Sequence, residues 1–108
     1  MRAASSRDLL AWLLGRRFRV RVAGPSMEPT LRDGATVLVK PDVTPQDGDI
    51  VLVQHPTEAR LRILKRVDHR TEDGRFFLRG DASTSTDSRD FGPVDPERIV
   101  GRVVCTLP

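Results

Sequence analysis

The chain has 108 residues, of which 18 are basic and 15 acidic, so its formal net charge is +3. This length fits one small domain and leaves no room for two separate cores. The one cysteine, Cys105, excludes an internal disulfide framework and a multi-cysteine zinc site, and its place near the end of an apolar run indicates an inert core residue. The basic residues are 16 arginines and only two lysines, Lys40 and Lys65.

The N-terminal segment, residues 1–17, is predicted to hold a short helix over Arg7–Leu14, capped by Ser6. Its apolar run, Leu9–Leu14, is much shorter than the roughly 20 residues that a membrane-spanning helix needs. No small-residue cleavage site follows this run. We therefore expect neither a transmembrane segment nor a signal peptide. The helix either packs on the domain or lies on a membrane surface beside the two arginines that follow it.

Residues 18–108 have the pattern of short strands separated by turns. The first strand alternates apolar residues with arginines, which is typical of a half-buried strand, and we interpret these arginines as a solvated face rather than a phosphate-binding patch. The fold class is therefore mostly β, a compact antiparallel β-barrel-like domain over residues 18–108. The six strands are expected over Phe18–Val22, Ala35–Val39, Ile50–Val53, Arg60–Val67, Arg75–Arg79 and Ile99–Val104.

A serine follows the first predicted strand in a proline-rich segment, Gly24–Leu31. The prolines disfavour both helix and ladder pairing, so Ser26 is expected on a rigid, exposed turn. A fixed position and nearby free N–H groups are what a nucleophilic serine needs. The alternative is an ordinary turn serine, and the choice depends on whether the chain supplies a base.

A candidate base lies in the fourth predicted strand, Arg60–Val67. Alternation places Leu61, Ile63 and Val67 on the same face as Lys65, with the arginines of the strand on the other face. Burial on the apolar face would lower the pKa of Lys65 and provide a neutral amine near pH 7, which can take the proton from a serine hydroxyl. The alternative is a lysine whose stem packs while its ammonium group reaches solvent.

The segment Gly80–Val94 is rich in short oxygen-bearing side chains, which bond their own backbone and build ordered loops. Its alternating Asp and Ser residues have the spacing of a calcium loop, but the turn glycine is replaced by Thr86 and the twelfth position is Gly92 instead of glutamate. We therefore predict no metal site. Asp87 and Arg89 are expected to pair and hold the loop, while a serine hydroxyl orients the lysine amine.

Three other polar residues are interpreted as surface residues. His55 precedes a proline in a loop, His69 lies near a hairpin, and Lys40 ends a strand. Neither histidine has a local nucleophile motif such as Gly-x-Ser-x-Gly. A Ser-His-Asp triad is therefore not predicted.

Three segments, taken in their order along the chain, resemble motifs of the type I signal peptidases. The resemblance covers residues 22–104. The segments are Gly-Pro-Ser26-Met-x-Pro-Thr-Leu, then Lys65-Arg66-Val67, then Gly80-Asp81 through Ser85-x-Asp87-Ser88-Arg89 with Gly92-Pro93-Val94 and Gly101-Arg102.

The resemblance implies a serine endopeptidase on a β-rich fold, without a cofactor, that cleaves after small residues. Ser26 would be the nucleophile, with its backbone N–H in the oxyanion hole, and Lys65 the general base. Met27 matches a residue beside the binding cleft. Ser85 matches the hydroxyl that positions the lysine, and the Asp–Arg pair predicted in the same loop matches a supporting ion pair. The implied partner is a protein substrate with an N-terminal signal or propeptide.

The sequence also departs from the family pattern. Gly24 stands where many members carry a serine that assists the oxyanion hole, and Ala82 replaces an asparagine. The usual membrane anchor and large insertion are missing. This short form, with its His55-Pro56 segment, resembles the maturation proteases of nickel-containing superoxide dismutase. Self-cleaving repressors also use a Ser-Lys pair, but they carry a DNA-binding domain, for which the 25 residues before Ser26 leave no room.

The leading hypothesis is thus a Ser-Lys endopeptidase that binds an extended peptide by strand addition. It acts either in nickel superoxide dismutase maturation or as a general signal peptidase at a membrane. We expect a location in the cytoplasm or at the periphery of a membrane, and no nucleic-acid partner. The rival hypothesis, from another class, is a noncatalytic β-domain whose arginine face binds a peptide or nucleic acid.

Overall fold

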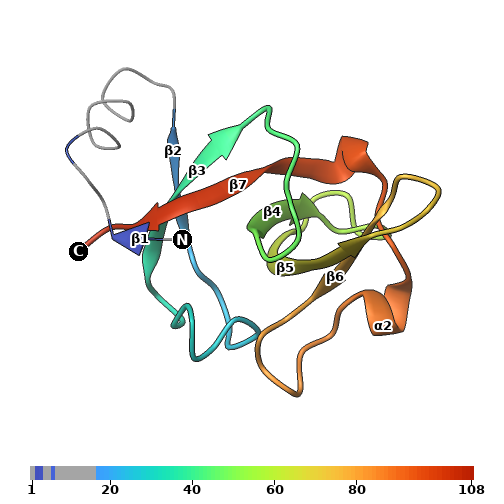
Figure 1. The fold of residues 1–108 in the computed structure, drawn as a ribbon. Helices are drawn as coiled ribbons and strands as arrows, with labels where there is room; N and C mark the ends of the chain where they lie inside the picture. Colours follow the sequence, from blue (N-terminus) through green and yellow to red (C-terminus); the bar gives the residue numbers. More distant parts are fainter. Residues whose placement is uncertain (1, 4–5, 7–16) are drawn as a thin grey trace.

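The computed structural model of the chain describes residues 2–3, 6 and 17–108. The helix predicted over Arg7–Leu14 lies outside the described residues. The elements, shown in Figure 1, are β1 (Arg2–Ala3), β2 (Phe18–Arg21), β3 (Thr36–Pro41), β4 (Ile50–Gln54), β5 (Arg62–Arg70), β6 (Phe76–Arg79), the short helix α2 (Ser88–Phe91), the 3-10 turn η1 (Pro96–Arg98) and β7 (Ile99–Thr106).

The strands form one sheet in the order β2-β3-β7-β4-β5-β6, and every pair along this path is antiparallel. The predicted mostly antiparallel β fold is therefore confirmed. In the described part of the chain, β2 and β6 at the two ends of the order do not pair with each other, so the sheet is open and not closed into a barrel. The strand β1 adds a short parallel pairing to the end of β7.

The long strand β7 joins the two halves of the sheet (Figure 1). Its C-terminal part pairs with β3 through residues 101–106, and its first part pairs with β4 through residues 99–102. Two apolar clusters result, one under each half, and β4 serves both. Its side chains alternate between the two clusters, and four of its five residues are buried. A continuous β-branched and leucine run is what a strand buried on both faces requires.

All six predicted strands are present, with boundary shifts of one to three residues. The prediction of which residues of Arg60–Val67 lie on the apolar face of the strand was partly wrong. Leu61 lies outside β5 and is 44% exposed, whereas Leu64, on the face of the arginines, is buried. The reason is that β5 also contributes to both clusters, with Leu64 in one and Val67 in the other.

Candidate active site

Ser26 lies in the loop between β2 and β3, in a turn that the core holds in place. The Glu28 N–H donates to the Pro25 carbonyl at 3.0 Å, and the Leu31 N–H donates to the Met27 carbonyl at 2.9 Å. The Met27 side chain is 1% exposed and belongs to the cluster under β2 and β3. Burying a methionine contributes about 1.5–3 kcal/mol. The adjacent Ser26, itself half-buried, is thereby held at a defined position on the surface.

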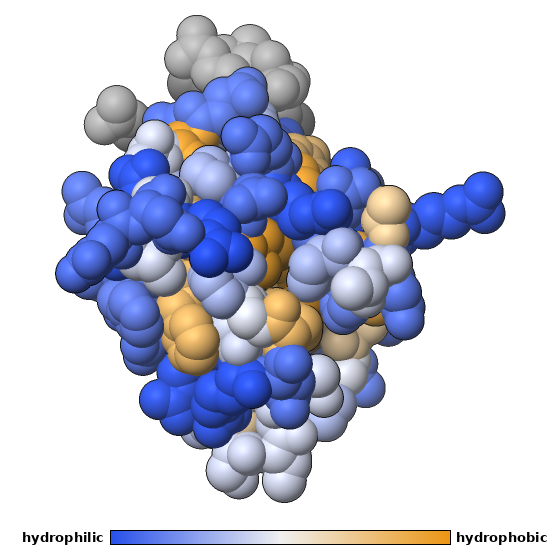
Figure 2. All heavy atoms as spheres, turned by 90° about the vertical axis from the view of Figure 1, so that its right-hand side faces the viewer, coloured by the Kyte–Doolittle hydropathy of each residue, from blue (hydrophilic) through white to orange (hydrophobic). Residues whose placement is uncertain are grey.

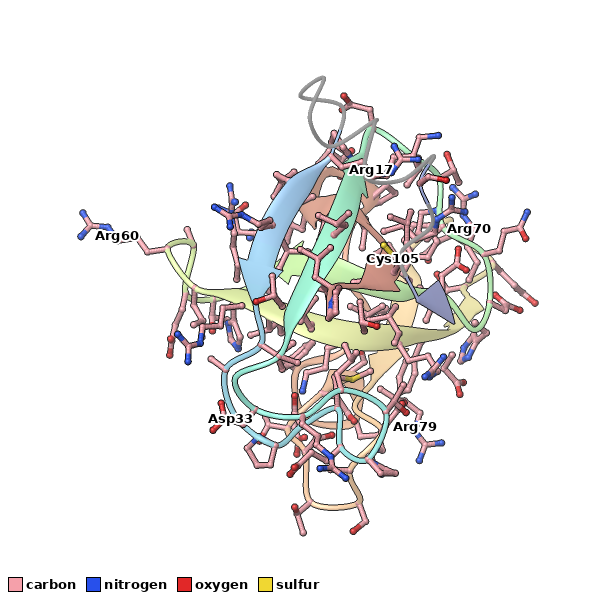
Figure 3. The ribbon with its side chains drawn as sticks, turned by 90° about the vertical axis from the view of Figure 1, so that its left-hand side faces the viewer. Arg17, Asp33, Arg60, Arg70, Arg79 and Cys105 are labelled. Atoms are coloured by element: carbon pink, nitrogen blue, oxygen red, sulfur yellow. The ribbon has the colours of Figure 1, made fainter. Side chains whose placement is uncertain are left out.

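Gly24 has a backbone φ of +85°, in the left-handed region that favours glycine. Its N–H donates to Asp33 Oδ1 at 3.0 Å across the same loop. In Figure 3, Asp33 lies on the loop that hangs below the sheet. A serine at position 24 would be strained in this turn.

The loop that follows β6 packs directly against the Ser26 turn, and the two loops meet below the sheet in Figure 1. The Ala82 N–H donates to the Ser26 carbonyl at 2.9 Å. At Gly80, an added Cβ would lie 2.8 Å from the Ser26 carbonyl oxygen and would overlap the Ser85 side chain. Such a contact is closer than a real Cβ tolerates, so only glycine permits this approach. Backbone contact thus joins the Ser26 turn to residues 80–87.

Lys65 lies in the middle of β5, opposite Val51 of β4. It is 4% exposed, so the prediction that it shares a buried face is confirmed. Burial lowers the pKa of its ammonium group below the usual lysine range. The nearby Asp87 carboxylate opposes this shift and raises the pKa, while Arg89 lowers it further. Lys40, the other lysine, is half-buried at the end of β3.

Asp87 is fully buried and collects hydrogen bonds from the loop around it. Its carboxylate accepts from the Gly80 N–H at 3.0 Å, from Ser85 Oγ at 3.2 Å, and from Arg89 through the backbone N–H, Nε and one terminal nitrogen at 2.9–3.0 Å. Burial by itself would raise the pKa of this carboxyl, but these donors together lower it far below the usual range. Asp87 therefore stays charged and caps helix α2.

Residues 80–87 thus connect the Ser26 turn and Lys65, the predicted nucleophile and base, into one cluster. The loop hydrogen-bonds to the Ser26 carbonyl, and its Asp87 carboxylate acts on the Lys65 ammonium group. Within the described residues, no hydrogen bond joins the Ser26 hydroxyl to the Lys65 amine. Catalytic hydrogen bonds are often long before substrate binds and tighten with it.

A groove of about 380 Å³ opens beside Ser26, between the edge of β2 and the start of β5. Met27, Ile63 and Leu64 line it, and Lys65, the next residue of β5, is not among its lining residues. Its described lining consists of Phe18, Arg19, Val20, Arg21, Val22, Ala23, Ser26, Met27, Leu52, Leu61, Arg62, Ile63 and Leu64.

Residues 11–104 match the family described as Peptidase S24-like. The chain belongs to this family. Because the matched range includes every predicted site residue and nearly the whole sheet, the resemblance to the type I signal peptidases is confirmed at the level of the family.

Curated relatives of this S24-like chain include three proteins of mitochondria. The chain is 32% identical to "Mitochondrial inner membrane protease subunit 1" of Homo sapiens over 78% of its length and 65% of the human protein. It is 32% identical to "Mitochondrial ATP-independent inner membrane protease subunit 1b" of Arabidopsis thaliana over 81% and 68%. For the Xenopus tropicalis subunit 1 the identity is 31% over 75% and 63%. The chain therefore spans about two thirds or less of the length of these relatives.

One ion pair near the site, between Arg66 and Asp81, was not predicted from the sequence. Arg66 donates to both carboxylate oxygens of Asp81 at 2.8 and 2.7 Å and to the Gly48 carbonyl at 2.7 Å, and Thr30 Oγ1 donates to the same carboxylate at 2.5 Å. The pair therefore fastens the Ser26 loop and the 80–87 loop to β5. The sequence signal was the position of Arg66 directly after Lys65, and of Asp81 directly after Gly80.

Other predictions concern residues away from this cluster. His55 Nδ1 accepts the N–H groups of Thr57 and Glu58, and His69 is hydrogen-bonded to Asp68 and stacked on a phenylalanine. The His55 ring also packs edge-on against Phe91 of α2, and the phenylalanine stacked on His69 is Phe77 of the neighbouring strand β6. The described residues hold no group of three or more His, Cys, Asp or Glu side chains placed to bind a metal ion. None of the helices described is both long and apolar enough to cross a membrane.

Proposed function

We propose that this chain is a serine-type endopeptidase in which Ser26 is the nucleophile and Lys65 the general base. The observation that carries the proposal is the burial of Lys65 at 4% exposure beside the loop that also binds the Ser26 turn. A lysine in bulk water is charged at neutral pH and cannot accept a proton, whereas burial favours the neutral amine. The burial of Lys65 thus supports its assignment as a base.

In the proposed reaction, the neutral Lys65 amine accepts the proton of the Ser26 hydroxyl while Oγ attacks the scissile carbonyl. The resulting ammonium group gives that proton to the leaving amine as the peptide bond breaks. Water then hydrolyses the acyl-enzyme: Lys65 accepts a proton from the attacking water and returns it to Ser26 Oγ as the bond to the acyl group breaks. The ion pair of Asp87 and Arg89 acts as a positioning element, since it fixes the conformation of the loop that contacts the Ser26 turn.

The oxyanion of the tetrahedral intermediate would be stabilised by backbone donors. Among the described residues, the Ser26 N–H has no hydrogen-bond acceptor, so it is available to a substrate. With Gly24 in a left-handed conformation and without a side-chain hydroxyl, this backbone donor carries more of the stabilisation.

The proposed substrate is an extended peptide that lies in the groove and pairs with a strand edge. Among the described residues, β2 pairs only with β3, and β5 pairs with β6 from residue 66 onward, so the β2 edge and the first residues of β5 face the groove. Main-chain pairing would present the scissile bond to Ser26. Cleavage after small residues remains an expectation carried over from the family.

The biological substrate is proposed to be a protein with an N-terminal signal or propeptide, processed at the periphery of a membrane or in the cytoplasm. The relatives named as inner membrane proteases support a membrane-proximal role. The precursor of a nickel-containing superoxide dismutase stays one predicted substrate. Incubation of the chain with that precursor, and with a membrane protein precursor, distinguishes the two by which one is shortened.

The proposal is tested by comparing peptide cleavage by the natural chain with that of Ser26→Ala, Lys65→Arg and the matched control Lys40→Arg. We expect the first two variants to lose activity, because a guanidinium group cannot act as a base at neutral pH, and the control to retain it. Cleavage by Lys65→Arg at the natural rate would overturn the Ser-Lys assignment. Binding to DNA with a steep salt dependence, together with no cleavage, would favour the noncatalytic rival.

A further inference from the structure

The charged residues of the groove are all of one sign. Of the described residues that line it, Arg19, Arg21 and Arg62 are basic, and none is acidic. The chain as a whole is nearly balanced, with 18 basic and 15 acidic residues, so this lining departs from the average surface. Figure 2 shows one face of the molecule, on which hydrophilic residues predominate around smaller apolar patches. Positive charges around a concave, partly apolar site raise the local concentration of anionic ligands.

The placement of two of these arginines follows from the pairing of β2. Phe18 and Val20 pack on the apolar cluster, whereas Arg19 and Arg21 are exposed and alternate with them. A peptide strand lying along the β2 edge would also alternate its side chains between these two faces. Side chains on the face of the arginines would then lie about 4.5–5.5 Å from them between Cβ atoms, as cross-strand neighbours do.

We propose that the groove selects extended peptides with acidic side chains, which pair with Arg21 of the β2 edge and Arg62 of β5, and with small apolar side chains between them. This inference rests on the proposed function, because it assigns the substrate of the same groove. Arg62, on the opposite wall, adds to the positive potential. Neither Arg21 nor Arg62 forms an ion pair with an acidic residue that the structure describes, so both remain available to a ligand.

The chain offers a matched control for charge at this site. Arg60 is exposed, lies two residues before Arg62 and is absent from the groove lining. Figure 3 shows its side chain projecting away from the body of the protein at the end of the β4–β5 hairpin. Replacing Arg60 by glutamate changes the net charge as much as the same replacement at Arg21, but outside the groove.

The test uses the full chain carrying Ser26→Ala, so that peptides bind without being cleaved. Three fluorescent peptides of equal length alternate alanine with aspartate, asparagine or lysine, and their affinities are measured by fluorescence anisotropy. We expect the aspartate peptide to bind about fivefold to tenfold more tightly than the asparagine peptide at low salt. This preference should shrink in about 0.3 M salt, where the charges are screened.

Charge reversal in the groove provides the second arm. Arg21→Glu combined with Arg62→Glu should abolish the preference for the aspartate peptide and favour the lysine peptide, and Arg21→Gln should reduce it. Arg60→Glu should leave it unchanged. Equal affinities for the three peptides, no binding of the aspartate peptide, or an equal loss in Arg60→Glu would each overturn the inference. Absence of cleavage by the unmutated chain, with the binding preference intact, would contradict the proposed function and leave the selectivity standing.

Discussion

Lys65 differs from the arginines around it in one property, which is that it can exist as a neutral amine when buried. Of the 18 basic residues only two are lysines, and Lys65 is the one that the fold buries between β4 and β6. A charged group in an apolar site costs free energy unless it is paired or neutral. The function proposed for Lys65 therefore has a cost in stability, which can be measured.

Replacing Lys65 by methionine should remove that cost. We expect the free energy of unfolding at pH 7 to rise by about 1–2 kcal/mol, because folding must either remove the proton of Lys65 or desolvate its charge, and methionine has neither cost. The gain should shrink as the pH rises toward the usual lysine pKa of about 10.4, where the amine is neutral in the unfolded chain as well.

Urea unfolding at several pH values measures this difference. Lys40→Met serves as the control, and peptide cleavage should be lost only in Lys65→Met. A variant that is less stable than the natural chain at pH 7 would show that the buried ammonium group is well compensated, and would weaken its assignment as a base.

Arg89 influences the same amine through its charge. Since Arg89 lowers the pKa of Lys65, Arg89→Gln should raise it, and the Asp87 carboxylate released from its partner should raise it further. Cleavage needs the neutral amine, so the rate rises with pH through this pKa, and the acidic limb of the kcat/KM profile should move to higher pH. Arg60→Gln should leave the limb in place. An unchanged limb in Arg89→Gln would restrict Arg89 to a structural role.

The parts of the site that depend on local sequence patterns could be predicted, and those that depend on contacts between distant residues could not. Ser26 and Lys65 could be proposed from the sequence because a proline-bracketed serine and a lysine on an apolar face are local patterns. The contact of Gly80 with the Ser26 carbonyl was not predictable, since it joins positions 54 residues apart and leaves no periodic signal. The role of Asp81 was missed for the same reason.

At the level of elements, the Arg66–Asp81 pair links three segments, β5 and the two loops that form the site. Its side chains are 35% and 16% exposed, so the pair is only partly shielded from water. We expect Asp81→Asn to lower the free energy of unfolding by about 1–2 kcal/mol, because charge-assisted hydrogen bonds from Arg66 and Thr30 are weakened.

The same substitution should reduce kcat more than it raises KM, since the groove residues are untouched while the two loops lose their common anchor. Steady-state kinetics with a cleavable peptide, together with thermal unfolding, separate these effects. Asp73→Asn, which removes an exposed pair with Arg75 in the β5–β6 hairpin, is the matched control and should leave cleavage unchanged. A kcat in Asp81→Asn equal to that of the unmutated chain would show that the Arg66–Asp81 pair does not position the reacting groups.

The positions of the strands were easier to predict than the side of the sheet on which each side chain lies. Alternation or β-branched runs located all six main strands, because the side-chain period of a strand is a local property. The arrangement of the strands relative to one another depends on contacts between residues far apart in the sequence, so local patterns could not predict it. β5 crosses between two apolar clusters, so Leu64 is buried on the face of the arginines and Leu61 is exposed. Helix α2, with only four residues, lies below the length at which periodicity is informative.

For the molecule as a whole, the stability of the fold at acidic pH depends on ionised carboxylates, two of which lie in the loop next to Ser26. Hydrogen bonds from Arg66 to Asp81 and from Thr71 to Asp73 lower the pKa of each carboxyl, and the donors around Asp87 do the same there. A group with a lowered folded-state pKa stabilises the fold above its unfolded pKa, which is about 3.9 for aspartate. That stability is lost as the pH falls toward the folded-state value.

We therefore expect the free energy of unfolding to decrease steadily below about pH 4 and to vary much less between pH 5 and pH 7 as far as these groups are concerned. Urea unfolding at pH 5, 4 and 3 measures the slope, and Asp87→Asn should make it shallower while lowering stability at pH 5. A slope below pH 4 that is the same in the natural chain and in Asp87→Asn would show that Asp87 contributes nothing to the acid limb.

The most direct test of a Ser-Lys peptidase is covalent labelling of Ser26. The chain is treated with a serine-reactive acylating probe at a series of pH values, and the acylated residue is identified by mass spectrometry. We predict a single acyl group on Ser26, with a labelling rate that rises with pH through the lowered pKa of Lys65 and falls to background in Lys65→Met. Labelling of Ser26 at the same rate in Lys65→Met, or acylation of another serine in its place, would contradict this assignment.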